Sequence, residues 1–177
     1  MQCLTPDECS KWLQERNIIE FPYANSRQGM KLQFEPPRNP RKLTAFVRQL
    51  IGEPGEYLGA FGEFSGALLQ FIDWPTYNFD EMALISSLRR SHGEERWLIV
   101  APGHLFTSTE AAEAIGHCYL AAIFDWNAYL YLPSGAAALY FWEGDLIDFS
   151  SCDQKIFQDV CEIVERFELR VTYKHTS

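Results

Sequence analysis

The middle of the sequence contains the residue types of a thiol hydrolase, namely Cys118, His104 and Asp125. Such an enzyme needs a cysteine nucleophile, a base that takes its proton and an acid that orients the base. His117 is next to Cys118, but neighbouring residues of a strand point to opposite faces, so the base would have to be His104. The sequence therefore allows a small hydrolase-like enzyme with a pocket near His104. The alternative is that Cys118 is a buried structural thiol.

A second set of residues has the chemistry of a metal site. Glu110, Glu113 and His117 are separated by three and four residues, which places side chains on one face of a continuous helix. Carboxylate and imidazole groups arranged in this way could hold a divalent metal, or the two carboxylates could share acid–base chemistry. Gly116 is expected to end the helix, however, and would then turn His117 away. The alternative is a solvated acidic first turn that the helix dipole favours, and we predict neither a metal nor a cofactor.

Aromatic side chains alternate along two predicted strands, near residue 130 and near residue 140. Because successive side chains of a strand point to opposite faces, one face of this sheet should be rich in tyrosine and tryptophan. If helices cover only the other face, these rings are exposed, and acids in the next turn would select a basic partner. If helices or the amino-terminal segment cover both faces, the same rings are core residues. The candidate partner-binding residues are Tyr129, Tyr131, Tyr140, Trp142, Glu143 and Asp145.

The helices that must position these residues have clear start signals. Thr5, Pro6 and Glu8 combine an N-cap residue, a proline in the first turn and a capping box, which predicts a helix over about residues 6–16. Further helices should begin after Asn39, Asn78, Thr107 and Ser151. The last of them repeats apolar residues at helical spacing, so we expect a long amphipathic helix there.

The segments between these helices are short, aromatic or β-branched, and bounded by turn residues, as in strands. The predicted strands are Met30–Phe34, Ala67–Ile72, Trp97–Val100, Tyr119–Phe124, Ala128–Leu132, Ala137–Trp142 and Asp145–Phe149. The connections between the last four are too short for anything but antiparallel hairpins. We therefore predict an α+β fold in a single domain, residues 1–177, with a mainly antiparallel sheet. It should contain a carboxy-terminal meander over about residues 119–149, followed by the long helix, with the other helices packed on the sheet.

Composition narrows the classes of partner. The net charge is −9, and residues 97–165 contain ten acidic residues but only one basic residue, Lys155. Such a field repels nucleic acid and anionic membranes and attracts cationic partners. No apolar run reaches the roughly 18 residues that a membrane helix needs, and the start of the chain lacks the pattern of an export signal. The five cysteines are odd in number and include no C-x-x-C pair, so we expect a reducing cytoplasm.

Three functional hypotheses follow from these observations. The first is a non-enzymatic acidic protein that binds a basic protein through the aromatic strands and their acidic turn, for example an inhibitor of the immunity-protein type. The second is the hydrolase-like enzyme near His104, using Cys118 or the carboxylates of Glu110 and Glu113. The third is a structural subunit of a larger assembly, in which the aromatic face would be permanently covered.

Overall fold

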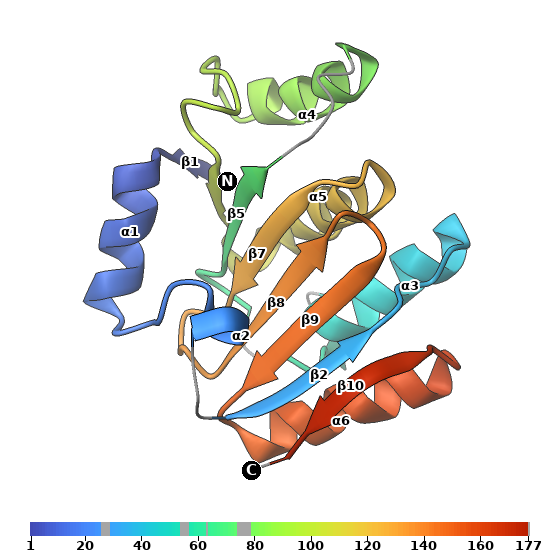
Figure 1. Cartoon of the computed structure of the whole chain (residues 1–177). Helices are drawn as coiled ribbons and strands as arrows, with labels where there is room; N and C mark the ends of the chain where they lie inside the picture. The colour runs from blue at the N-terminus through green and yellow to red at the C-terminus, as the bar shows by residue number, and fades with distance from the viewer. Residues whose placement is uncertain (26–28, 54–56, 63, 74–78, 177) are drawn as a thin grey trace.

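The sheet is the central element of the structure. The computed structural model describes residues 1–25, 29–53, 57–62, 64–73 and 79–176. Within these residues eight strands form one antiparallel sheet in the order β1-β6-β5-β7-β8-β9-β2-β10 (Figure 1). The strands are β1 (Gln2–Leu4), β2 (Met30–Phe34), β5 (Leu68–Asp73), β6 (Gly103–Leu105), β7 (Asn127–Tyr131), β8 (Ala137–Trp142), β9 (Leu146–Ser151) and β10 (Val171–His175). A separate ribbon pairs β3 (Gly52–Glu53) with β4 (Tyr57–Leu58).

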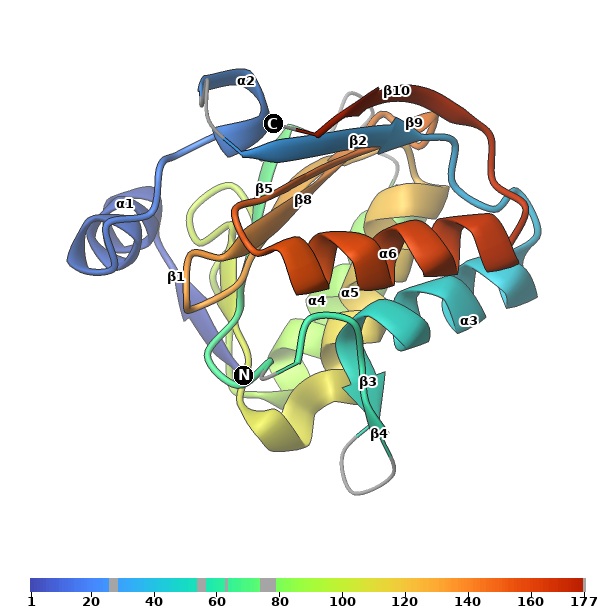
Figure 2. The same ribbon diagram turned by 90° about the horizontal axis from the view of Figure 1, so that it is seen from below.

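The two faces of the sheet are covered differently. Three helices lie on the back face, α3 (Pro40–Ile51), α5 (Ala111–Ile123) and α6 (Gln154–Arg166), as Figure 2 shows. The front face, which is turned to the viewer in Figure 1, carries α1 (Pro6–Glu15) and the single turn α2 (Pro22–Asn25). A further helix, α4 (Phe79–Ser91), lies beyond the end of β5, and a short 3₁₀ turn, η1 (Ser108–Glu110), precedes α5.

Each face has its own apolar core. The larger core lies between the sheet and the back helices, where α6 contributes Phe157, Val160 and Val164 at helical spacing. The smaller core lies under α1, whose Trp12 and Leu13 pack in a cluster with residues of β5, β7 and β8. Burial on both faces fixes which side of each strand points forward, because a one-residue slip in register would exchange the faces.

The front face is only partly covered. α1 covers the side of the sheet near β5 and β7, and α2 contacts β8 and β9. Figure 1 shows none of the described helices in front of the upper ends of β8 and β9 or in front of β2 and β10. The described residues of β10 are all exposed, and so is Trp142 at the end of β8. We call this uncovered part of the front face the open half.

The prediction of an α+β fold with an antiparallel sheet is confirmed. The strand predicted at Tyr119–Phe124 is wrong, because α5 passes through Gly116 and continues to Ile123. A short apolar run of this kind fits a buried helix as well as a strand, and periodicity alone does not separate the two. The strand predicted at Trp97–Val100 is also wrong, since these residues form a turn in which Val100 N–H donates to the Trp97 carbonyl at 2.9 Å.

Candidate functional site

The candidate partner-binding residues divide into buried and exposed groups. Tyr129 and Tyr131 belong to the core under α1 and are almost completely buried. The ring of Phe21 lies against Tyr129 with 5.2 Å between centroids, and the Phe21 N–H donates to the Tyr131 hydroxyl at 3.3 Å. The amino-terminal segment therefore covers these two tyrosines, and neither forms part of an exposed binding surface.

Tyr140 and Trp142 lie where this cover ends. The Tyr140 ring stacks on Tyr129 with 4.3 Å between centroids and an interplanar angle of 11°, so one ring face is fixed against the core. Trp142 is 43% exposed, and its position two residues further along β8 places it on the same face of the sheet as Tyr140. The exposed indole of Trp142 is therefore on the same sheet face as the buried stack of Tyr129 and Tyr140.

Three carboxylates lie near Tyr140. Asp148 of β9 is directly opposite it in the register of the sheet, and Glu143 follows the end of β8. Asp73 is paired with Asn127, whose side-chain oxygen accepts hydrogen bonds from the Tyr140 hydroxyl and from the Glu143 N–H, both at 3.1 Å. The pKa of Tyr140 is raised by burial first and then by repulsion from Asp148, Glu143 and Asp73. These three carboxylates therefore act electrostatically on the Tyr140 hydroxyl.

We call this set of residues the Tyr140 site. It consists of Asp73, Tyr140, Trp142, Glu143 and Asp148.

Sequence reasoning missed Asp148, which is only 4% exposed. Its Oδ1 accepts a hydrogen bond from Gln33 Nε2 at 2.7 Å, and the hydroxyl of Thr172 donates to Gln33 Oε1 at 2.7 Å. Burial raises the pKa of Asp148, and the Gln33 hydrogen bond and the charge of Lys31 partly oppose this. Asp148 is two residues after Leu146 on β9, so both side chains lie on the same face of the sheet. This alternation could have identified Asp148 as a carboxylate on the half-covered face.

Glu143 and Asp145 lie in the turn between β8 and β9. Glu143 and Gly144 both have left-handed φ angles, 47° and 64°, as in the two-residue turns that match the twist of a hairpin. Asp145 N–H donates to the Trp142 carbonyl at 3.1 Å and closes the turn. The Asp145 carboxylate pairs with Arg38 at 3.0 Å, but both side chains are exposed, so this pair stabilises the fold little.

His104 and His117, which were assigned to different candidate sites, lie together in the interior. Their rings are 4.9 Å apart between centroids, and both residues are fully buried. Nδ1 of His104 is 3.1 Å from the Pro102 carbonyl oxygen, and Nδ1 of His117 is 2.7 Å from the Glu113 carbonyl oxygen. Burial lowers the pKa of both, to about 4 for His117, so both imidazoles are neutral at pH 7.

The hydrolase chemistry finds little support in this geometry. Cys118 is fully buried in α5, and burial raises the pKa of its thiol. Catalytic cysteines have the opposite character, with a lowered pKa and an accessible sulfur. The enzyme hypothesis therefore remains a prediction that the surroundings of Cys118 do not favour.

The predicted metal ligands do not converge. His117 meets Glu113 through the backbone carbonyl of Glu113, and its ring points to His104. Glu110 accepts hydrogen bonds from the Thr107 N–H at 2.8 Å and from the amino group of Met1. In the part of the chain that the structure describes, no three histidine, cysteine, aspartate or glutamate residues form a group able to hold a metal.

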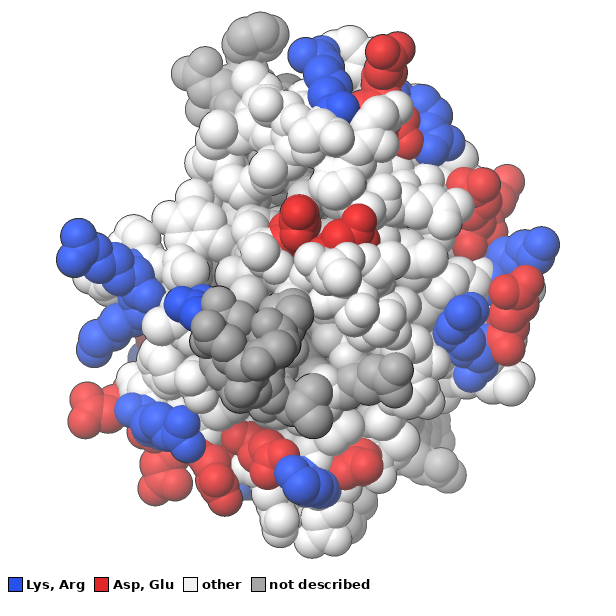
Figure 3. Space-filling view, turned by 180° about the vertical axis from the view of Figure 1, so that it is seen from behind, with Lys and Arg blue, Asp and Glu red and all other residues white. Residues whose placement is uncertain are grey.

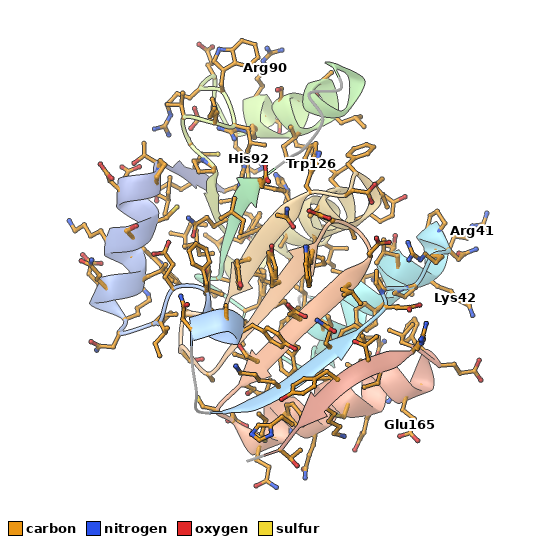
Figure 4. The ribbon with its side chains drawn as sticks, viewed as in Figure 1. Arg41, Lys42, Arg90, His92, Trp126 and Glu165 are labelled. Carbon is orange, nitrogen blue, oxygen red and sulfur yellow. The ribbon has the colours of Figure 1, made fainter. Side chains whose placement is uncertain are left out.

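The acidic residues of the sequence are distributed over several surfaces. Figure 3 shows the side opposite to the front face, where acidic and basic side chains occur together around the rim and acidic side chains also lie near the upper centre. On α6, the described exposed acids include Glu162 and Glu165, and Figure 4 shows Glu165 pointing away from the sheet. The Tyr140 site is distinguished from α6 by combining its carboxylates with exposed and half-buried aromatic rings.

The described helices include none with both the length and the apolar character needed to cross a membrane. Comparison of the chain with protein-family models, with curated proteins and with solved structures returned no match.

Proposed function

We propose that this protein is a non-enzymatic binding protein that holds a basic segment of a partner protein on the open half of its front face. The contact surface would be the Tyr140 site together with Asp145 of the adjoining turn. One observation carries the proposal, the position of the exposed Trp142 on a sheet face that the described helices leave uncovered, on the same strand as Tyr140, which is paired with Asp148.

The physical argument rests on the kinds of side chain that dominate binding. Tryptophan and tyrosine are enriched among the residues that contribute most to protein interfaces. Acidic residues around them would speed association with a cationic partner and disfavour anionic ones. The chain as a whole, with a net charge of −9, would attract the same class of partner over a longer range.

The residues beneath this surface support the proposal by holding it rigid. Tyr140 is fixed by its stack on Tyr129 and by its hydrogen bond to Asn127, and the same oxygen of Asn127 fixes the Glu143 backbone. A preformed surface loses less conformational entropy on binding than a mobile one. The buried Tyr129 and Tyr131 would therefore support the surface, while Tyr140 and Trp142 would contact the partner.

A concrete version of the proposal is an inhibitor that neutralises a cationic protein, as immunity proteins do. It is supported by the acidic character of the chain and by the absence of an activated nucleophile among the candidates of the sequence analysis, since burial raises the pKa of Cys118.

The test is affinity capture from a lysate of the native host at low and at high salt. The wild-type protein is compared with a variant carrying Glu143→Lys and Asp145→Lys. A control variant carries Glu162→Lys and Glu165→Lys, an identical change of charge on α6, on the other side of the sheet. We expect wild type and control to retain the same basic protein at low salt and the Glu143/Asp145 variant to lose it. Equal retention by all three proteins would refute the proposal.

A further inference from the structure

We infer that the Tyr140 site receives the side chain of an arginine from the partner, with Asp148 accepting hydrogen bonds from the guanidinium and the rings of Tyr140 and Trp142 supplying stacking surfaces. This inference rests on the proposed function and names the chemical group that the site would recognise.

Asp148 is the first reason for it. A buried carboxylate is costly unless a positive charge and several hydrogen bonds compensate it. Among the residues that the structure describes, the hydrogen bond to Asp148 comes from the neutral amide of Gln33, and no ion pair joins it to a lysine or an arginine. The nearby Lys31 attracts it electrostatically, and Lys31 donates a hydrogen bond to the Tyr23 carbonyl at 2.6 Å. The carboxylate, although only 4% exposed, therefore has one neutral hydrogen-bond donor and no paired cation within the described part of the chain, and a cation that enters beside Tyr140, its partner across the sheet, would be favourable there.

The second reason is that this carboxylate is oriented. Thr172 donates to Gln33 Oε1, and this leaves Gln33 Nε2 to donate to Asp148 Oδ1, each at 2.7 Å. Gln33 is opposite Asp148 in the pairing of β2 with β9, so three adjacent strands contribute to the chain of hydrogen bonds. Such support is typical of acceptors that must present their oxygens in one direction.

The aromatic rings distinguish arginine from lysine. Tyr140 has one face against Tyr129, and it lies across from Asp148 in the sheet. A planar guanidinium can stack on an aromatic ring while its N–H groups form a paired contact with a carboxylate. An ammonium group can do only part of this, because it is a compact charge without a flat face. The combination of an exposed Trp142, a half-buried Tyr140 and an oriented Asp148 therefore favours arginine.

The test uses short peptides and the full chain labelled with ¹⁵N. Three acetylated and amidated pentapeptides carry arginine, lysine or citrulline between pairs of glycines, where citrulline has the shape of arginine without the charge. Binding is followed by chemical-shift changes of the Trp142 indole N–H and of the Gln33 side-chain amide. We expect arginine to bind at least about tenfold more tightly than citrulline, as for loss of one charged hydrogen bond, and more tightly than lysine. Equal affinity for arginine and citrulline, or for arginine and lysine, would overturn the inference.

A matched pair of variants locates the effect. Asp148→Asn should abolish the preference for arginine over citrulline, while Asp159→Asn, the same change on α6, should retain it. An arginine preference that survives Asp148→Asn would overturn the inference. The wild-type protein provides a second readout without mutation, since binding of the arginine peptide should weaken as Asp148 is protonated at low pH, and binding of the citrulline peptide should not.

These results are separable from the capture experiment. A partner that the Glu143/Asp145 variant loses and that Asp148→Asn retains would overturn the arginine assignment and leave the proposed function in place. Arginine-selective peptide binding without any partner lost by the Glu143/Asp145 variant would support arginine recognition at the Tyr140 site and refute the proposal that this site holds a protein partner.

Discussion

Replacing Asp148 with asparagine should make the protein more stable at neutral pH, although the residue is buried and hydrogen-bonded. The substitution keeps an oxygen that can accept from Gln33 Nε2 and removes the buried negative charge. Replacing a buried charge with a neutral group of similar shape is often stabilising. We expect a gain of about 1 kcal/mol in the free energy of unfolding, within the roughly 0.5–2 kcal/mol that single stabilising substitutions commonly give.

The difference in stability between the wild type and the Asp148→Asn variant should depend on pH. The pKa of Asp148 is raised in the folded protein, so at pH values between the unfolded and the folded pKa the folded state retains a proton that the unfolded state has released. Stability of the wild type therefore falls as the pH rises through this window, whereas the asparagine variant has no such proton. The two proteins should be closest in stability at the lowest pH of the series and should separate as the pH increases.

Thermal unfolding followed by circular dichroism from pH 4 to pH 8 measures this difference. At pH 7 a gain of about 1 kcal/mol corresponds to a midpoint roughly 2–4 °C higher for a chain of this length. A variant that is less stable than the wild type at pH 7, or a difference that does not change with pH, would refute the reasoning. Either result would mean that the charge of Asp148 is already compensated within the protein.

The remaining predictions concern the thiols and two glycines. Iodoacetamide at pH 7.5 should label the exposed Cys152 and leave Cys118 unmodified until the protein unfolds, because burial raises the pKa of Cys118. Peptide mapping measures the labelling, and rapid labelling of Cys118 in the folded protein would favour the hydrolase hypothesis. Gly144→Ala should lower the free energy of unfolding by about 1–3 kcal/mol, since φ is 64° and an added Cβ would overlap the Asp125 carboxylate. Gly116→Ala, within α5, should raise the free energy of unfolding by about 0.5–1 kcal/mol, because alanine favours the helix and the added Cβ meets no atom within 4 Å. Chemical denaturation measures both variants, and a Gly144→Ala protein more stable than the Gly116→Ala protein would contradict both predictions.

Local signals predicted local structure well. The capping box expected at Thr5 is present, with Glu8 N–H donating to the Thr5 hydroxyl at 3.3 Å and Thr5 N–H donating to the Glu8 carboxylate at 2.7 Å. These contacts depend on residues three positions apart and are therefore encoded in a short stretch of sequence. In contrast, β10 is a fully exposed edge strand of five residues that lies outside the strands predicted from the sequence, although Val171 and Tyr173 alternate with polar residues in it. It forms because β2 provides a free edge, which is a property of the folded sheet.

In the candidate site, too, local features could be predicted from the sequence and contacts between distant elements could not. Alternation along β8 correctly places Tyr140 and Trp142 on one face, because residues two apart on a strand always lie on the same side of the sheet. The cover over Tyr129 depends on the path of residues 18–21, and a contact between residues more than a hundred positions apart cannot be derived from spacing. The contact of His104 with His117 likewise depends on how two elements pack, because one residue lies on β6 and the other on α5.

The most direct test of the central claim is an oxidative footprint of the captured complex, read at two tryptophans of the same chain. Trp142 lies in the Tyr140 site and is 43% exposed, whereas Trp97 is 71% exposed and lies in the turn that follows α4. Hydroxyl-radical labelling followed by mass spectrometry compares the two indoles with and without the bound partner. The proposed function predicts that oxidation of Trp142 decreases in the complex while that of Trp97 is unchanged. Protection of Trp97 without protection of Trp142 would contradict it and would place the partner at α4.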